Sequence, residues 1–458
     1  MSTADRAVRA RGPRPAGTRE PAGRRGGLDS LGAVTVVAFL AVITLAWAFL
    51  RPAGFANRQY VGELFGVLAV ACLSAALVLT MRVPAVERAF GGLDRVYVWH
   101  RILAISGLVL FLPHWLFVGG GRSAGVRDPA SPAGAPHYGP GNLLGVVSIL
   151  GLTLLAVISL APRIPVLASL LRLAYRRWLA SHRLAGLLVA AAVVHGLMVD
   201  PVIRASAGLW WVYLAVGAMG VAAFATRVIS DLRGWGRADH VVTRVERLSP
   251  NLLEVWMRPR RSRLDFTPGQ FVYASFGGTG YWQPHPFTIS SSPADPDLRL
   301  SIRSNGDHTT SLYRHLTEGI PVAIEGPYGG FHHELATGPQ VWIAGGIGVT
   351  PFLSWAGADD VPAHVDLFYV VPHAGDAVYL DELHDAAARN RGLHVHLSTD
   401  DRDGFLTADR VAGAITSRLQ DCSVFMCGPP PMIRSLEAGL VERGVRPEAI
   451  HYEEFSFR

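Results

Sequence analysis

The sequence predicts a multi-domain membrane protein: a six-helix transmembrane bundle, followed by an antiparallel β-barrel and an α/β domain with a parallel sheet. Half of the 458 residues are hydrophobic and only 17% are charged, a composition typical of a protein with several membrane spans. Six apolar runs of membrane-spanning length lie within residues 28–232. Beyond residue 238 the apolar runs shorten to strand length and alternate with turn residues.

The first 27 residues are rich in arginine, glycine and proline and lack apolar periodicity, which predicts a disordered basic tail. The length and polarity of this segment argue against an ordinary signal peptide. The spans that follow are predicted at residues 31–50, 60–81, 96–118, 142–161, 179–199 and 209–229.

The placement of arginine predicts how the spans are oriented. The tail and the 82–95 and 162–178 loops are basic, and basic segments tend to stay in the cytoplasm. We therefore expect an integral protein of the cell membrane with both termini and the C-terminal domains in the cytoplasm. The net charge of +6 lies largely in this tail and these loops, so it indicates contact with the lipid bilayer and no nucleic-acid partner.

Four histidines lie inside two of the predicted spans. His100 and His114 are 14 residues apart in the third span, and His182 and His195 are 13 apart in the fifth. At about 1.5 Å per helical residue, each spacing corresponds to roughly 20 Å, most of the hydrocarbon thickness. Ionisable residues at such depth are costly and usually functional, although a single histidine in a span is also often a packed, hydrogen-bonded residue.

One span separates the two histidine-bearing spans, so we expect them to run in the same direction. His100 then shares a depth with His182, and His114 with His195. This predicts two metal-binding sites, each a planar iron macrocycle held by one histidine from each helix. Thirteen residues do not return to the same helix face, so the second helix needs a bend or a π-bulge, which we expect near Gly186.

The remaining chain is predicted to contain two kinds of sheet. Barrel strands are expected at residues 240–248, 252–258, 271–276, 298–303 and 322–324. Strand–helix alternation is expected over residues 341–344, 352–357, 365–371, 380–390, 394–398, 424–427 and 431–443, which is typical of a doubly wound parallel sheet. The predicted domains are residues 1–27, 28–232, 238–335 and 336–458.

Two motifs in the barrel suit a flavin. In His-Pro-Phe-Thr-Ile-Ser, starting at His285, the Phe287 ring can cover an isoalloxazine face and the Thr288 hydroxyl can hydrogen-bond to the ring edge. In Gly-Asp-His-Thr, starting at Gly306, a glycine opens a helix whose dipole suits a pyrophosphate. Alone, the first motif is also compatible with an ordinary strand that ends in a serine-rich turn.

Three further turns suit a dinucleotide. The predicted strand 341–344 runs into a glycine-rich turn at Gly345 that ends in Thr350 and Pro351, which suit the N-cap and N1 positions of a helix. Gly-Pro-Tyr-Gly lies at 326–329 and Cys-Gly-Pro at 427–429, where strands are predicted to end. The aromatic Phe455 could stack on the flavin, as could Phe457, unless this segment is a final buried strand.

In combination, these histidines and motifs resemble the ferric reductase/NADPH oxidase superfamily, over about residues 28–458. The resemblance implies a membrane domain with two b-type haems and a dehydrogenase that uses FAD and NADPH or NADH. It implies that the haem iron ligands are His100, His114, His182 and His195. The implied flavin-site residues are His285, Pro286, Phe287, Thr288, Ser290, Arg303, Gly306, Thr309, Gly326 and Phe455. The implied nucleotide-site residues are Gly345, Gly346, Gly348, Thr350, Pro351, Cys427, Gly428 and Pro429.

Thr288, Cys427 and Phe455 are the residues expected to take part in catalysis. Many relatives that use NADPH carry an arginine after the strand predicted at 365–371, where this chain has Pro372 and His373. The resemblance therefore leaves the choice between NADPH and NADH open, and it does not predict the oligomeric state.

The expected activity is an NAD(P)H oxidase or ferric-reductase-type reaction that carries electrons across the membrane to an external small-molecule acceptor. Dioxygen, giving superoxide, is preferred because the outer loop has no evident iron-binding cluster; a ferric chelate is the alternative. Two other interpretations stay open: a proton channel or transporter with a regulatory reductase-like domain, and a soluble-type reductase whose spans only anchor it.

Overall fold

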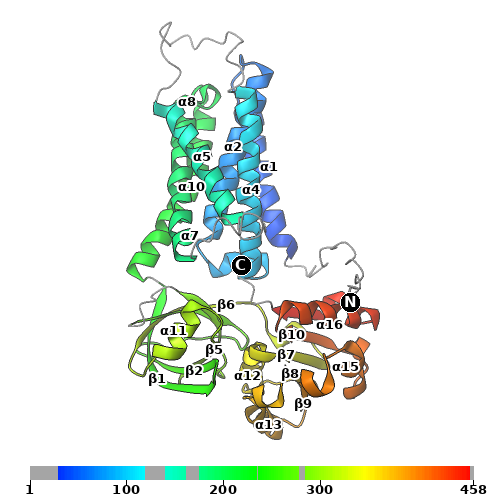
Figure 1. Ribbon diagram of the computed structural model, residues 1–458. Helices are drawn as coiled ribbons and strands as arrows, with labels where there is room; N and C mark the ends of the chain where they lie inside the picture. The colour runs from blue at the N-terminus through cyan, green and yellow to red at the C-terminus, as the bar shows by residue number, and fades with distance from the viewer. Residues whose placement is uncertain (1–28, 119–139, 161–174, 235, 278–283, 454–458) are drawn as a thin grey trace, which may run out of the picture.

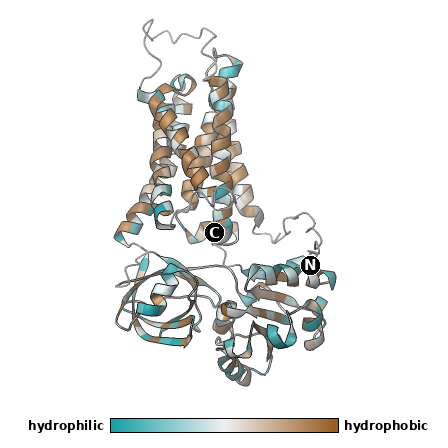
Figure 2. Ribbon diagram, viewed as in Figure 1, coloured by the Kyte–Doolittle hydropathy of each residue, from teal (hydrophilic) through white to brown (hydrophobic). Residues whose placement is uncertain are grey.

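The computed structural model describes residues 29–118, 140–160, 175–234, 236–277 and 284–453. Figure 1 shows the membrane helices as one bundle that stands on two domains lying side by side, the barrel and the parallel sheet. Hydropathy follows the same division, because the bundle is mainly apolar whereas the two lower domains expose polar residues (Figure 2).

Six helices in the described part of the chain are long and apolar enough to cross a membrane, as the sequence predicts. They are α1 (Asp29–Leu50), α2 (Asn57–Leu79), α4 (Leu93–Val118), α5 (Pro140–Leu160), the α7–α8 pair (Tyr175–His182 and Leu184–Val199) and α10 (Ala207–Arg233). Two short helices, α3 (Pro84–Phe90) and α9 (Pro201–Arg204), lie in the connections.

The bundle is built from two main helix pairs. Helix α2 packs mainly against α4, and α5 packs mainly against α8. Glycines permit this close approach, since a Cβ on Gly107 would lie 2.8 Å from Leu73 and one on Gly151 would lie 2.8 Å from Leu188. The outward faces carry exposed apolar side chains such as Leu112 and Leu150, which suits contact with lipid.

The fifth span is divided into two helices by a slight interruption. Helix α7 ends at His182 and α8 begins at Leu184, while Arg183 between them keeps helical angles (φ −60°, ψ −23°), so the interruption falls at Arg183 and not near Gly186. Gly186 has a packing role instead, because a Cβ there would lie 2.3 Å from the Phe224 ring of α10.

The barrel is an antiparallel sheet with the strand order β4-β3-β6-β1-β2-β5. Its strands are β1 (Arg237–Ser249), β2 (Leu252–Pro259), β3 (Phe271–Phe276), β4 (His285–Thr288), β5 (Leu298–Arg303) and β6 (Pro321–Tyr328). Helix α11 (Asp307–His315) contributes Leu312 to a core that includes Val255 and Leu300. Strand β6 lies at the side of the barrel that faces the membrane helices (Figure 1), and its residue Glu325 contacts Arg82 and Arg227 of the membrane domain.

The last domain has a parallel sheet with the order β11-β10-β7-β8-β9. The strands are β7 (Gln340–Gly345), β8 (Val365–Val371), β9 (Leu393–Thr399), β10 (Ser423–Cys427) and β11 (Ile450–Glu453). The helices are α12 (Thr350–Ala356), α13 (Leu380–Arg389), α14 (Asp400–Asp403), α15 (Ala408–Ala414) and α16 (Pro430–Glu442), with short 3-10 turns between them. Buried cores lie on both faces of the sheet.

Side-chain contacts join the barrel to the parallel-sheet domain. The Arg299 guanidinium of β5 lies 2.6 Å from the Glu382 carboxylate of α13. The Tyr379 hydroxyl donates a hydrogen bond to Ser301 at 2.7 Å. These contacts hold the carboxyl ends of β5 and β7 close to each other, and the two predicted ligand-binding motifs follow those strand ends.

Candidate functional site

The four predicted histidines form two levels in the bundle. The rings of His100, on α4, and His182, at the end of α7, lie with centroids 6.3 Å apart and planes at 72°. His114 and His195 form the other level and lie close enough to interact electrostatically. The structure therefore brings together the pairs that the spacing predicts.

At three of these histidines the Nδ1 atom is held by a backbone carbonyl. His100 donates to Ala76 O at 2.8 Å, and His195 donates to Gly141 O at 2.8 Å. His114 donates to Gly62 O at 2.9 Å. A histidine that uses Nδ1–H in this way keeps Nε2 as a neutral ligand atom, the usual arrangement around a metal-bound imidazole.

His182 reaches its carbonyl through a serine. Its Nδ1 lies 3.3 Å from Ser159 Oγ, which in turn donates to Leu155 O at 2.7 Å. Trp178 Nε1 also donates to Ser159 Oγ, at 3.1 Å. At His182 the Ser159 hydroxyl therefore takes the place that a backbone carbonyl has at the other three histidines.

The hydrogen-bond partners of the four histidines come from α2 and α5. On α2 they are the carbonyls of Gly62 and Ala76, 14 residues apart like His100 and His114. On α5 they are the carbonyl of Gly141 and the hydroxyl of Ser159, so each helix supplies one partner at each histidine level. Sequence reasoning missed this second layer of the site.

Two more glycines seat the second level of histidine rings. A Cβ on Gly66 would lie 2.7 Å from His114 Nδ1, and a Cβ on Gly145 would lie 2.8 Å from His195 Cε1. Both glycines come four residues after an acceptor glycine, so a Gly-x-x-x-Gly pattern at the start of the second and fourth spans was the available signal.

Buried acidic side chains lie beside the second level. Glu63 Oε2 lies 3.7 Å from His114 Nδ1, and the Glu63 and Asp200 carboxyl groups are hydrogen-bonded. Asp200 also accepts from the backbone N–H of Val202 and Ile203. An acidic residue inside an apolar span is itself a sequence signal of function.

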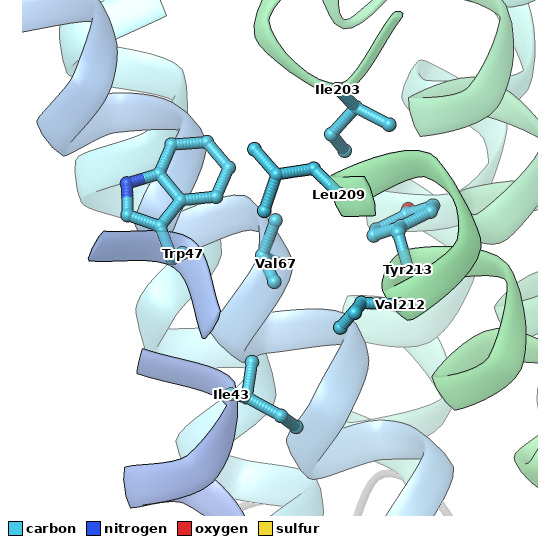
Figure 3. A pocket seen from close by; sticks show the side chains of 7 residues that line it. All are labelled: Ile43, Trp47, Val67, Ile203, Leu209, Val212 and Tyr213. Atoms are coloured by element: carbon cyan, nitrogen blue, oxygen red, sulfur yellow. The ribbon is translucent and has the colours of Figure 1, made fainter. Parts of the chain in front are cut away.

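An apolar hollow lies between α1, α2, α9 and α10 (Figure 3), and none of the four histidines is among its lining residues. Its lining is hydrocarbon apart from the Trp47 indole nitrogen and the Tyr213 hydroxyl, so it offers little to a polar ligand. The lining residues are Ile43, Trp47, Val67, Ile203, Leu209, Val212 and Tyr213.

The two barrel motifs meet at a histidine stack. The His285 ring, on β4, lies on the His308 ring of α11 with centroids 3.6 Å apart and planes at 8°. Burial and the neighbouring His285 lower the pKa of His308 to about 4, so this ring is neutral at physiological pH. Pro286 and Phe287 lie opposite Tyr273 and Val272 of β3.

Two hydroxyls of the first barrel motif differ in whether they have a hydrogen-bond partner. Thr288 Oγ1 is buried and has no hydrogen-bond partner among the described residues, which fits a group supplied by a bound cofactor. Ser290 Oγ lies 3.2 Å from Arg299 O and 3.0 Å from Ser301 Oγ, so it is already held by the barrel.

The second barrel motif lies next to the glycine-rich turn. Gly306 precedes α11, and Thr309 Oγ1 accepts from the Asn305 N–H at 2.9 Å. Arg303 Nη1 lies 3.6 Å from the position that a Cβ on Gly346 would occupy. The two motifs therefore lie at one junction between the domains.

The glycine-rich turn packs against the Cys-Gly-Pro turn at the carboxyl ends of β7 and β10. A Cβ on Gly348 would lie 2.2 Å from Cys427 O, and one on Gly345 would lie 2.8 Å from Pro429 Cδ. Gly428 is similarly crowded, because its Cβ would lie 3.0 Å from the Gly345 Cα. Only glycine fits at these positions, which leaves backbone amides open to a phosphate.

The helix after the glycine-rich turn begins one residue earlier than predicted. Thr350 is the first residue of α12 and not its N-cap, and its Oγ1 donates back to Ile347 O. Pro351 is therefore the second residue of the helix, where the first was predicted. Burial raises the pKa of the Cys427 thiol, so it stays protonated, and Phe455 lies outside the described residues.

Gly326, predicted to begin a turn, instead lies within β6 near the C-terminal end of that strand. Its φ of +136° is a conformation that favours glycine. Tyr328, two residues later, is buried against Phe271 of β3.

Three family models match consecutive parts of the chain. Residues 65–194 match a ferric reductase like transmembrane component, residues 239–332 an FAD-binding domain, and residues 342–438 an oxidoreductase NAD-binding domain. This combination of domains matches the ferric reductase/NADPH oxidase superfamily. The chain is an oxidoreductase with a membrane domain and domains that bind FAD and NAD(P)H.

Curated relatives align with 41–49% of the length of this chain. The electron transfer component of 2-halobenzoate 1,2-dioxygenase from Burkholderia cepacia is 28% identical over 231 residues, which is 47% of this chain and 66% of that protein. Flavohemoprotein A from Dictyostelium discoideum is 24% identical over 246 residues, 49% of this chain and 62% of the relative. The chain thus spans just under two thirds of these relatives.

Among solved structures, the chain is similar to the Amycolatopsis cytochrome P450 reductase GcoB, with 24% identity and a TM-score of 0.42 over 48% of this chain and 69% of that one. It is also similar to the FAD/NAD binding domain of nitric oxide dioxygenase from Vibrio cholerae. That comparison gives 22% identity and a TM-score of 0.43 over 48% of this chain and 98% of the other.

Proposed function

We propose that this transmembrane NAD(P)H oxidoreductase passes electrons from cytoplasmic NADPH or NADH to an acceptor outside the membrane, with dioxygen as the acceptor. The balanced reaction is NAD(P)H + 2 O2 → NAD(P)+ + H+ + 2 superoxide. The single observation that carries the proposal is the set of four histidines, paired at two depths with Nδ1 fixed by hydrogen bonds.

The histidine pairs are suited to hold two b-type haems. His100 with His182, and His114 with His195, would each supply two neutral imidazole ligands, because Nδ1 is engaged and Nε2 is left for iron. When bound, FAD converts the hydride of the nucleotide into single electrons and the haems supply one-electron centres. Gly66 and Gly145 keep the second-level rings in place.

The barrel residues would hold and orient FAD. In this proposal Phe287 covers the flavin ring, and the buried Thr288 hydroxyl, which has no partner among the described residues, hydrogen-bonds to its edge. Arg303 supplies a charge for the pyrophosphate. The remaining proposed contacts are His285, Pro286, Ser290, Gly306, Thr309, Gly326 and Phe455.

The turns of the parallel-sheet domain would hold the nucleotide. The close packing of Gly348 on Cys427 leaves the backbone of both turns open to the dinucleotide phosphates. Cys427, as a neutral thiol, is placed to line the site where hydride leaves the nicotinamide. The other proposed contacts are Gly345, Gly346, Thr350, Pro351, Gly428 and Pro429.

Sealed vesicles test the direction of electron flow. Nucleotide is added on the side of the dehydrogenase, and ferricytochrome c is enclosed on the other side. We expect reduction across the membrane that superoxide dismutase abolishes. No reduction by either NADH or NADPH, with the acceptor accessible only from the far side, would contradict the proposal and favour a reductase that is merely anchored.

A ferric-chelate reductase with the same electron path is the second candidate, and the same vesicles distinguish it. Reduction that superoxide dismutase leaves unchanged, together with Fe(II) formation from an impermeant chelate, would favour iron as the acceptor. His114→Leu tests the proton-channel interpretation. A channel should keep its full haem content in this variant, whereas our proposal expects the loss of one haem.

A further inference from the structure

Glu325, at the membrane-facing end of β6, lies in a cluster of arginines that comes from both parts of the molecule. Its Oε1 atom is 3.1 Å from Arg82 Nη1, in the connection after α2, and 2.9 Å from Arg227 Nη1 of α10. Arg237 of β1 approaches Oε2 at 3.8 Å. Glu325 is buried, with 8% of its side chain exposed, so these charges are poorly screened by water.

Arg82 is held in an uncommon conformation. Its φ is +54°, a left-handed value that residues other than glycine rarely adopt. Its guanidinium donates to the Tyr97 hydroxyl at 3.0 Å and lies 3.8 Å from the centre of the Tyr273 ring of β3. Arg82 therefore contacts α4, one turn before His100, and two strands of the barrel at once.

Further ion pairs connect this cluster to the helix that carries His182. Asp231, on α10, lies 3.0 Å from Arg227 and 2.8 Å from Arg183, the residue at the break directly after His182. It also lies 3.3 Å from Arg237. The helix that carries His182 is thus connected to Glu325 by ion pairs through Asp231 and Arg227, and α4 is connected to it by the hydrogen bond of Arg82 to Tyr97.

Two further contacts fix the same junction. The Gly329 N–H, in the turn after β6, donates to Glu87 Oε1 of α3 at 2.7 Å. Phe271, Tyr273 and Tyr328 of the barrel are buried in one cluster with side chains of α2 and α4. Burial alone would raise the pKa of Glu325, but Arg82 and Arg227 hold it below its ordinary value, so the carboxylate stays charged.

We propose that Glu325, clamped by Arg82 and Arg227, is the positioning residue that docks the flavin barrel beneath the His100–His182 pair. This inference rests on the proposed electron path. It adds the contact that sets the distance between the flavin and the metal site at the His100–His182 level. Electron transfer slows steeply as centres separate, so loosening the junction slows the exit of electrons from the flavin and leaves hydride entry unchanged. Each nucleotide oxidised supplies two electrons, which leave the flavin in two one-electron transfers.

The test uses the full-length protein with Glu325→Gln, and Glu246→Gln as the matched control. Glu246 lies on the same barrel, but it is exposed and pairs with Arg244. Hydrogen exchange by mass spectrometry reports the junction through the amides of residues 326–331. Anaerobic stopped-flow reports bleaching of the flavin by nucleotide and, separately, the Soret shift that marks haem reduction.

We expect Glu325→Gln to raise amide exchange in this segment about tenfold, because it removes one partner of a buried ion cluster. Haem reduction should slow by a similar factor, flavin bleaching should stay within twofold of the parent rate, and the control should change none of these. Glu87→Gln, which weakens the Gly329 contact, should give a smaller change in the same direction.

Unchanged exchange and unchanged haem reduction in both variants would overturn the inference. A parallel loss of flavin bleaching would also overturn it, because it would show general damage to the barrel. If the parent protein carries no haem, the proposed function fails, whereas the exchange comparison still decides whether Glu325 docks the barrel.

Discussion

His114 and His195 each rest on a glycine of the neighbouring helix, and this contact leads to a first prediction. Gly66→Ala or Gly145→Ala would place a methyl group 2.7–2.8 Å from the imidazole ring, so the ring must move. Displacing the support of a metal ligand typically weakens metal binding about 10–100-fold. Each variant should therefore lose the second-level haem, measured as haem per chain after purification.

Gly413→Ala is the matched control for these variants, because nothing lies within 4 Å of a Cβ at that position. Full haem content in Gly66→Ala and Gly145→Ala would show that the rings do not depend on the glycines.

His308 gives the barrel a pH dependence. Its pKa of about 4 in the folded protein lies below the value of about 6.5 for an unfolded histidine, so the unfolded chain binds the proton more readily. The stability that depends on neutral His308 is present above about pH 6.5 and is lost as the pH falls toward 4. We expect the flavin-release temperature to fall over this window.

The variant His308→Phe keeps a flat ring on His285 and removes the titrating group. Its flavin-release temperature should depend less on pH over the same window. An identical slope in parent and variant would assign the pH effect to other groups.

At the scale of elements, the turn after β7 requires glycine because it packs directly against the turn after β10. Gly348→Ala would drive a methyl group into the Cys427 carbonyl, 2.2 Å away, and so separate the two turns of the nucleotide site. We expect the KM for the nucleotide to rise about tenfold or more, since a clash with backbone costs more than about 1 kcal/mol. Flavin content should be unchanged.

Gly375→Ala, in the same domain and with open space around its Cβ, is the control for this variant. A normal KM in Gly348→Ala, measured by steady-state kinetics with NADH and with NADPH, would mean that the nucleotide binds elsewhere.

The sequence predicts elements well where a periodic pattern extends over a whole helix or strand. The six spans, most strands of both sheets and the pairing of histidines by depth followed from length, period and chain direction. Strands β4 and β11, only four residues each, were not among the expected strands. An irregularity was predicted near Gly186 from the 13-residue spacing, but the interruption lies at Arg183, and Gly186 is instead packed against Phe224. The acceptor role of Ser159 depends on the same tertiary geometry and leaves no local pattern.

The molecule as a whole is predicted to place the barrel and the parallel sheet on the cytoplasmic side. Cys72, Cys422 and Cys427 are buried, so cysteines introduced at exposed positions can be labelled selectively. Two exposed positions suit labelling in whole cells: Ala53→Cys, between α1 and α2, and Thr416→Cys, in the parallel-sheet domain. We expect an impermeant maleimide to label the first by at least about tenfold more than the second, because charged reagents cross lipid poorly. The opposite pattern would reverse the orientation.

In the proposed electron path, the nucleotide turns, the docked barrel and the two histidine levels follow one another through the chain. The contacts of Glu325 would fix the distance between the barrel and the bundle, and the hydrogen bonds on Nδ1 would fix the orientation of the imidazole rings. The steps of this path beyond the flavin depend on metal at both histidine levels.

Haem content per chain is the measurement that tests this account most directly. We predict that the purified protein contains two b-type haems with a bis-histidine spectrum. His100→Ala and His114→Ala should each retain one haem, and His315→Ala, an exposed histidine on α11, should retain two. A parent protein without a Soret band, or histidine variants that keep both haems, would contradict it.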